Sequence, residues 1–262
     1  MIMTQLQVSQ CIPLQTGVVY GPIRSRRLGN SLGINPLPTS YKLCSSNCVY
    51  CQYDWTTNDN PLGERLPSLD AIVQEAAEVF ARIASDGPRI DWITLAGNGE
   101  PTLHPALEAI VAALKRLRDQ HLPTAKVGIL SDSTTVQRAS VCRALRALDA
   151  RFMKLDVGTP EDFARINQPM GRVDWDRMIK GLRALPETTL QSMFVTGSLD
   201  NTQPSQVDAW IAVVGHVRPI AVHVYTIDRP PADRGLQKVS AQRLREIGDL
   251  LHQRTQIPTE VF

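Results

Sequence analysis

The feature that most constrains the fold is an alternation, from about residue 31 onward, of short apolar runs with longer amphipathic stretches. This alternation is typical of parallel strands joined by helices. The six predicted strands are residues 31–38, 90–97, 125–132, 150–157, 189–197 and 221–227. Six βα units are fewer than the eight of a closed barrel, so we predict an α/β fold with a (β/α)6 partial barrel. A doubly wound open sheet is the alternative.

Helix start signals support this reading between the predicted strands. Ser68, Pro105 and Thr134 each precede an amphipathic stretch. The predicted helices are residues 69–84, 106–120, 135–148, 174–185, 204–217 and 240–253. We predict one domain over residues 1–262, with an N-terminal segment (1–30), a core (31–230) and a C-terminal helix (231–262), because a chain of 262 residues can bury one large core.

The overall charge limits the expected partners. The chain has 28 Lys and Arg against 26 Asp and Glu, a net charge of +2, which gives no global case for a polyanionic partner but does not exclude RNA. The N-terminus lacks the basic start and apolar run of a signal peptide, and no apolar run approaches the roughly 20 residues of a membrane helix. We therefore expect a cytoplasmic protein without a membrane partner.

Three cysteines follow the first predicted strand in a C-x3-C-x2-C arrangement: Cys44, Cys48 and Cys51. Iron-sulfur clusters take cysteine thiolates as ligands, and three ligands leave the fourth iron of a [4Fe-4S] cluster open. Zinc is the alternative, although a structural zinc site normally has four ligands. Cys11 and Cys142 stand alone and are expected to be core or incidental residues.

The cysteine spacing, with Tyr50 before the last cysteine, resembles the signature of the radical S-adenosylmethionine (SAM) superfamily. The resemblance implies a partial barrel of the radical SAM type, a [4Fe-4S] cluster on the three cysteines and S-adenosyl-L-methionine on the open iron. It also implies reductive cleavage of SAM to a 5′-deoxyadenosyl radical that abstracts hydrogen from an unknown substrate, with flavodoxin or ferredoxin as electron donor. Tyr50 would lie near the adenine, or else pack within its loop.

The end of the second predicted strand carries Gly97, Asn98, Gly99 and Glu100. Glycines let the backbone approach a ligand closely, and a carboxylate accepts hydrogen bonds from an ammonium group. The segment resembles the Gly-Gly-Glu element of the superfamily, which binds the methionyl amine of SAM, with Asn98 in place of the second glycine. Without that resemblance, the same residues describe an ordinary turn between a strand and a helix.

Polar residues also end the later strands. Ser131, Asp132 and Ser133 could bind the ribose hydroxyls of SAM or cap the following helix. Lys154 and Asp156 alternate with apolar residues and therefore share one side of their strand. With Tyr225, they are the candidate catalytic residues if that side faces the interior; a structural ion pair is the alternative for Lys154 and Asp156. Asn167 and Asn201 could line the same mouth or serve as turn residues.

Three segments narrow the resemblance: YGPIRSRRLGNSLGIN, KLDVGTPEDFARINQP and YTIDRPPADRG. They are similar to small radical SAM proteins related to the wyosine-forming tRNA enzymes. Only Cys11 stands near the N-terminus, so the second cluster of the wyosine enzymes is not expected. Arginines in these segments, Arg24, Arg26, Arg27 and Arg229, could bind a carboxylate, a phosphate or a nucleic-acid backbone, or form salt bridges that fasten the N-terminal segment.

The sequence leaves the substrate open. A small molecule or a peptide is expected, with RNA not excluded. Two further functions are alternatives: a tRNA-modifying radical SAM enzyme, and a noncatalytic regulator that binds SAM and an iron-sulfur cluster. A structural zinc protein is a third alternative, which metal analysis would distinguish.

Overall fold

The computed structural model describes residues 11–57, 59–60 and 62–262, so the first ten residues of the predicted N-terminal segment lie outside it. In the described residues, nine strands form one sheet in the order β1-β2-β3-β4-β5-β6-β7-β9, with β8 paired to β6. The strands are β1 (Val19–Ser25), β2 (Gly29–Ile34), β3 (Trp92–Leu95), β4 (Lys126–Ser131), β5 (Ala150–Lys154), β6 (Thr188–Gly197), β7 (Ala221–Thr226), β8 (Leu236–Lys238) and β9 (Thr259–Val261).

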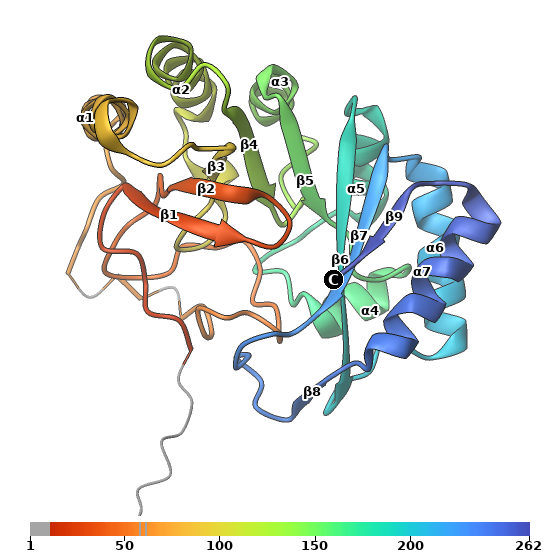
Figure 1. Ribbon diagram of the computed structural model, residues 1–262. Coiled ribbons are helices and arrows are strands. Elements are labelled where there is room, and N and C mark those ends of the chain that lie inside the picture. Colours follow the sequence, from red (N-terminus) through yellow and green to blue (C-terminus); the bar gives the residue numbers. More distant parts are fainter. Residues whose placement is uncertain (1–10, 58, 61) are drawn as a thin grey trace, which may run out of the picture.

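Strands β2 to β7 are parallel and follow one another in chain order, whereas β1 pairs antiparallel with β2. The helices are α1 (Leu69–Asp86), η1 (Pro101–Leu103), α2 (Leu107–His121), α3 (Ala139–Ala147), α4 (Pro160–Ile166), α5 (Trp175–Ala184), α6 (Pro204–Val217) and α7 (Ala241–Thr255). The long helices lie along the outer side of the curved sheet (Figure 1). A doubly wound sheet would have helices on both faces and a reversal of strand order. This sheet has its long helices on one side and its parallel strands in chain order, so the predicted partial barrel is confirmed.

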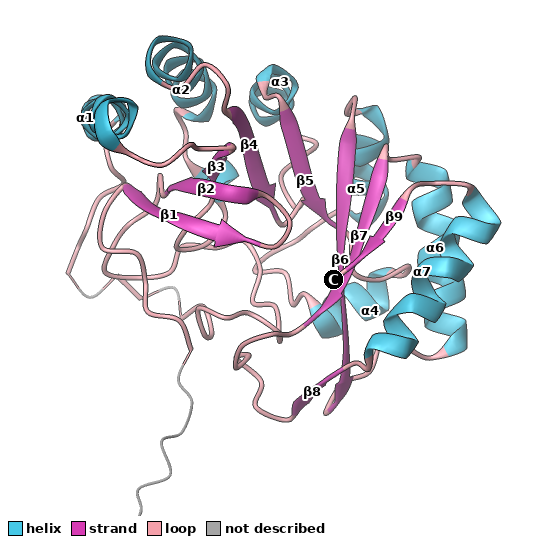
Figure 2. Cartoon of the chain, in the orientation of Figure 1, coloured by secondary structure: helices cyan, strands magenta, loops and turns pink. Residues whose placement is uncertain are grey.

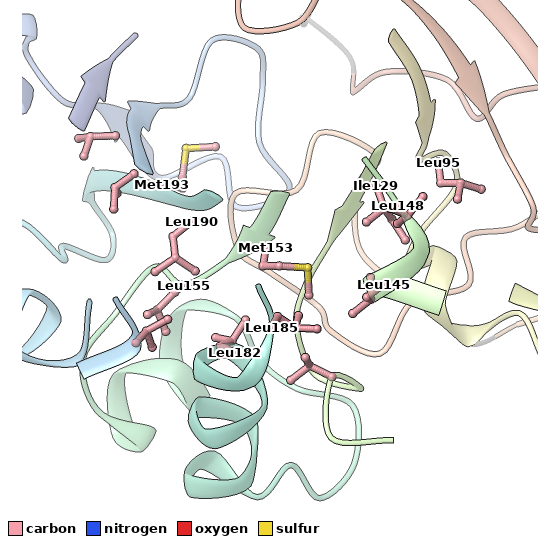
Figure 3. Packing of buried hydrophobic residues seen from close by; sticks show 14 of the residues in the cluster. Leu95, Ile129, Leu145, Leu148, Met153, Leu155, Leu182, Leu185, Leu190 and Met193 are labelled. Carbon is pink, nitrogen blue, oxygen red and sulfur yellow. The ribbon is translucent and has the colours of Figure 1, made fainter. Parts of the chain in front are cut away.

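The core lies between the outer side of the sheet and the helices, as the cyan and magenta layers of Figure 2 show. In Figure 3, Met153 of β5 and Leu190 of β6 lie over Leu182 of α5 and Leu185, the residue that follows α5. All four side chains are at most 6% exposed. Because side chains alternate along a strand, Lys154, the neighbour of Met153, is directed to the inner side of the sheet.

Two predicted boundaries are wrong for identifiable reasons. The first predicted strand, residues 31–38, ends at Ile34, because the side chain of Asn35 bonds to the Leu37 backbone and the next residue is a proline, which has no N–H. The helix predicted to follow Thr134 begins only at Ala139. Thr134 uses its hydroxyl to donate to Asp132 over 2.7 Å, so it caps no helix.

Five elements were not predicted: β1, η1, α4, β8 and β9. The predicted C-terminal helix of residues 231–262 is helical only over Ala241–Thr255, and β9 beyond it pairs with β7. Strands of three residues are too short to show periodicity, which explains why β8 and β9 were missed. In the part of the chain that the structure describes, no helix is long and apolar enough to cross a membrane.

Candidate active site

The cysteine loop, residues 42–51, is fastened on two sides at the carboxyl ends of the strands. On one side, Leu43 forms a parallel bridge with Gly99, just beyond β3. On the other side, the N–H of Val49 donates to the carbonyl of Ile166, the last residue of α4, over 3.0 Å. The loop is therefore held by backbone hydrogen bonds to elements that lie far apart in the sequence.

The three cysteine thiols of this loop are each partly buried. Asn167 donates from Nδ2 to the Cys48 Sγ over 3.6 Å, and the Cys44 Sγ lies 3.9 Å from Asp132 Oδ2. Burial raises the pKa of Cys48 to about 12 and also raises the pKa of Cys44, to which the charges of Asp132 and Cys48 add. These two thiols stay protonated at neutral pH unless a cation compensates the thiolate charge, as a bound metal does.

Beyond β3, Gly97 and Gly99 have φ angles of 148° and 137°, a region that residues with a Cβ rarely adopt. Asn98 stands between them and is fully buried. Its side chain accepts from the N–H of Gln15 over 2.8 Å and donates to the carbonyls of Gln15 and Pro38 over 2.9 and 2.8 Å. Asn98 thereby fastens the N-terminal segment to this turn, and its contact with a cofactor stays a prediction.

Two carboxylates, Glu100 and Asp132, meet beside the cysteine loop. The Oε2 of Glu100 accepts from the backbone N–H of Asp132, while its Oε1 accepts from the Thr102 hydroxyl over 2.6 Å. The Oδ2 of Asp132 accepts from the hydroxyls of Ser45 and Ser46, both over 2.8 Å. Burial, followed by the charge of Asp132, raises the pKa of Glu100 to about 8. Such a carboxyl group can ionise when an ammonium group binds beside it.

The raised pKa of Glu100 predicts a pH dependence of stability. The folded value lies above the unfolded value of about 4.3, so the folded chain binds more protons between these two pH values. The Glu100 carboxyl group therefore contributes to the free energy of unfolding below about pH 4.3, and this contribution is lost as the pH rises toward 8. We expect the unfolding free energy of the metal-free chain to fall across this window, by at most about 1.4 kcal/mol per pH unit from this group.

Urea unfolding at several pH values checks this expectation. Glu100→Gln removes the titrating group and should flatten the slope between about pH 5 and pH 8. Glu108→Gln is the matched control, because Glu108 is an exposed glutamate on α2 and should leave the slope unchanged. A Glu100→Gln chain with the wild-type slope would contradict the assignment.

The predicted catalytic residues form a buried cluster with two others, called the lysine cluster: Lys154, Asp156, Tyr225, Tyr50 and Asn167. The Nζ of Lys154 lies 2.7 Å from the Oδ1 of Asp156 and donates to the Tyr225 hydroxyl over 3.0 Å. The Oδ2 of Asp156 accepts from the Tyr50 hydroxyl and, over 2.7 Å, from Asn167 Nδ2. The predicted strand of residues 150–157 is wrong at its end, because β5 ends at Lys154 and the carboxylate of Asp156, instead of a backbone carbonyl, accepts from the Met193 N–H. The two side chains nevertheless lie together as an ion pair, and a catalytic role stays a prediction.

Other predicted residues connect the strand ends. Ser133 donates from its hydroxyl to the carbonyl of Lys154 over 2.8 Å, and its N–H donates to the hydroxyl of Ser131 over 3.1 Å. The side chain of Asn201 accepts from the Val195 N–H over 2.8 Å and donates to two backbone carbonyls, the pattern of a turn residue. These bonds join β4, β5 and β6 to the loops that follow them. Contact of Ser131 and Ser133 with SAM stays a prediction.

The model of the radical SAM superfamily matches residues 39–203, which is more than half of the chain. The chain belongs to the radical SAM superfamily. A UPF0026 protein of Synechocystis sp. is 30% identical over 225 residues, which cover 84% of this chain and 78% of that protein. The chain is thus also a member of the UPF0026 family.

Other relatives of this radical SAM chain are matched over only part of their length. A GTPase Obg of Brachyspira hyodysenteriae is 29% identical over 237 residues, and the match covers 89% of this chain but 33% of that protein. The S-adenosyl-L-methionine-dependent tRNA 4-demethylwyosine synthase TYW1 of Danio rerio is 23% identical over 169 residues, 58% of this chain and 22% of the synthase. These two matches leave most of each relative's length uncovered.

Two solved structures show the same fold as this radical SAM chain. A radical SAM methyltransferase from Sphaerobacter thermophilus has a TM-score of 0.65 at 13% identity, with 88% of this chain and 65% of that chain covered. TYW1 with a bound lysine-pyruvate adduct has a TM-score of 0.62 at 13% identity, with 86% and 74% covered. At such identity the likeness concerns the fold alone.

The sequence analysis did not identify the neighbouring residues whose hydrogen bonds orient the candidate site residues of this superfamily member. Ser45 and Ser46, which hold Asp132, lie between the first two cysteines and have no signal of their own. Asn167 was placed near the mouth, but its contacts with Cys48 and Asp156 join positions 119 and 11 residues apart. Only the folded arrangement of α4 against the cysteine loop brings them together.

Proposed function

We propose that the chain is a radical SAM enzyme that holds a [4Fe-4S] cluster on Cys44, Cys48 and Cys51. The observation that carries this proposal is the position of the cysteine loop, fastened beside the buried carboxylate of Glu100 and above the lysine cluster. Together, such a cluster and SAM supply one-electron chemistry: reductive cleavage of SAM gives methionine and a 5′-deoxyadenosyl radical, which abstracts hydrogen from a substrate. A flavodoxin or ferredoxin is the proposed electron donor.

The described part of the chain offers no site for a single metal ion, which supports a cluster on the three cysteines. Within the described residues, no three His, Cys, Asp or Glu side chains form a group that could hold one metal ion. A zinc ion with Zn–S bonds of about 2.3 Å needs its sulfur ligands about 3.8 Å apart. A cubane binds each thiolate at a different iron and therefore accommodates wider spacing.

The neighbouring residues have separate proposed roles in this enzyme. Glu100 accepts hydrogen bonds from the ammonium group of SAM, and the backbone at Gly97 and Gly99 leaves room for its methionyl part. Ser131, Asp132 and Ser133 lie beside the ribose, and Tyr50 beside the adenine. The lysine cluster lines the interior of the barrel. The side chains of Asp156 and Lys154 are only 0% and 14% exposed, so this part of the interior excludes water.

A deoxyadenosine assay tests the proposal. The chain is reconstituted anaerobically with iron and sulfide, reduced with dithionite and supplied with SAM; we expect about four irons per chain and 5′-deoxyadenosine. Cys48→Ala should lose deoxyadenosine formation, because one of the three cluster ligands is gone. Cys142→Ala, a partly buried cysteine on α3, is the matched control and should retain it. A wild type that binds only zinc would refute the proposal. A full, reducible cluster without deoxyadenosine would indicate either that the substrate must be present to trigger SAM cleavage or that the chain is the noncatalytic regulator.

A further inference from the structure

A cavity of about 350 Å³ lies on the open side of the barrel. Residues 23–27, at the end of β1 and in the turn to β2, form one wall. Four residues at the end of β7 and just beyond it form the other: Tyr225, Thr226, Asp228 and Arg229. Gln52 and Phe262 also line it, and Figure 1 shows the β1–β2 turn approaching the end of the chain across this opening. We call it the arginine cavity. Gln52 directly follows Cys51, so the cavity reaches the cysteine loop.

The lining of the arginine cavity is strongly cationic. Its charged side chains are Arg24, Arg26, Arg27, Arg229 and Asp228, a net charge of +3. The whole chain has a formal charge of only +2, so the remaining residues sum to −1 and provide no general attraction for a polyanion. The positive charge of this protein is therefore concentrated at one cavity.

Only one of these arginines is neutralised by an ion pair in the described part of the chain. Arg26 pairs with Asp228 over 3.0 Å, and Lys238 pairs with the same carboxylate over 3.1 Å. No ion pair to Arg24, Arg27 or Arg229 occurs among residues 11–57, 59–60 and 62–262. The salt-bridge interpretation therefore accounts for Arg26 and leaves the other three charges of the lining available.

Three buried polar atoms in this lining or on the strands that carry it have no hydrogen-bond partner among the described residues. Arg27 Nη1 belongs to a lining residue, and Gln191 Nε2 and His223 Nδ1 stand two positions before the lining residues Met193 and Tyr225. Gln191 and His223 are 3% and 6% exposed and are partners in the β6–β7 pairing, so both side chains face the same side of the sheet. Phe262, which lines the cavity, packs edge-on against His223 with ring centroids 5.2 Å apart. Arg27 Nη1 and Gln191 Nε2 are donors, whereas the role of His223 Nδ1 depends on the tautomer of the ring, so at least two of these unpaired groups favour a ligand with hydrogen-bond acceptors.

The arginine cavity also contacts the lysine cluster. The guanidinium of Arg27 lies 4.4 Å from the centre of the Tyr225 ring, and Tyr225 accepts a hydrogen bond from Lys154 over 3.0 Å. Lys154 pairs with Asp156, which Asn167 joins to Cys48. A ligand held at Arg27 therefore lies next to the wall of the proposed radical site.

We propose that the arginine cavity is the substrate site and that the substrate is a small molecule carrying a carboxylate or phosphate group, held by Arg27. This inference rests on the proposed function, because a substrate site presupposes an enzyme. Binding of the anion itself does not require the cluster or SAM. The guanidinium fork matches the geometry of an oxyanion, and Gln191 Nε2 adds a second donor. A volume of about 350 Å³ lies in the range of small-molecule sites, roughly 300–1,000 Å³.

Calorimetric titration of the full chain tests this proposal, without iron and without SAM. The probes are inorganic phosphate and, separately, malonate; the tighter of the two identifies the class of oxyanion. We expect Arg27→Gln to weaken binding of that probe at least tenfold and Arg27→Lys to weaken it less, because lysine retains the charge without the fork. Gln191→Leu should weaken binding severalfold. Arg82→Ala is the matched control, since Arg82 is an exposed arginine on α1.

The possible outcomes separate this inference from the proposed function. Binding that depends on Arg27 but not on Arg82 supports the site, whatever the deoxyadenosine assay shows. Equal binding by wild type and Arg27→Gln, provided that circular dichroism shows both folded, overturns it. Absence of oxyanion binding by the wild type also overturns it. So does binding of a single-stranded RNA oligonucleotide with steep salt dependence but of neither small probe, which would instead indicate a nucleic-acid surface.

Discussion

Replacing Asp156 by asparagine is expected to lower the unfolding free energy of the metal-free chain by about 3–5 kcal/mol. The side chain of Asp156 is fully buried, and its oxygens accept only from donors: Lys154, Asn167, the Tyr50 hydroxyl and the Met193 N–H. Asparagine offers one acceptor oxygen and would turn an N–H₂ group toward these donors. Lys154, 14% exposed, would remain charged in the interior without its counter-ion.

Urea unfolding measures this loss, and Asp228→Asn is the matched control. Asp228 also contacts two cations, Arg26 and Lys238, but is 45% exposed, so its replacement should cost less than about 1 kcal/mol. Adding Lys154→Met to Asp156→Asn removes the uncompensated charge and should recover part of the stability. An Asp156→Asn chain as stable as Asp228→Asn would show that this ion pair does not hold the interior together.

The central strands could be predicted from the sequence because each is buried by the helices outside it. Runs such as ITL in β3 and GIL in β4 carry enough apolar residues to be recognised without knowing their neighbours. Strand β1 was missed because Gly21 and Pro22 interrupt its pattern, and its pairing with β2 shifts between Tyr20 and Ile23. Such a strand is recognisable only from its partner.

The positions of candidate site residues could be predicted where they depend on the order of the strands along the chain. They could not be predicted where they depend on how the sheet curves. The cysteines and Glu100 stand directly after predicted strands, whose carboxyl ends meet at one edge of a parallel sheet. The ion pair of Lys154 and Asp156 agrees with the predicted period of two, although β5 itself ends at Lys154. The approach of Arg27 to Tyr225 joins opposite edges of the barrel, and it depends on how far the sheet curves.

Gly99→Ala is expected to destabilise the metal-free chain by about 2–4 kcal/mol and to lower its iron content after reconstitution. A Cβ at Gly99 would lie 1.7 Å from the Leu43 carbonyl oxygen, and the φ angle of 137° is strained for alanine. Leu43 would have to move, which breaks its bond to the Glu100 N–H and displaces the cysteine loop. Backbone strain of about 1–3 kcal/mol and one lost hydrogen bond of about 1 kcal/mol account for this range.

The matched control for Gly99→Ala is Gly215→Ala, the same substitution within α6. A Cβ at Gly215 meets its nearest neighbour, Thr255, at 3.5 Å, an ordinary contact, and alanine is favoured over glycine inside a helix by roughly 0.5–1 kcal/mol. Gly215→Ala should therefore be neutral or slightly stabilising and bind iron as the wild type does. If Gly99→Ala unfolded at the wild-type urea concentration, the bridge between Leu43 and Gly99 could not be what fastens the cysteine loop. If it lost stability yet retained full iron content, the cysteines would not need that bridge to reach a cluster.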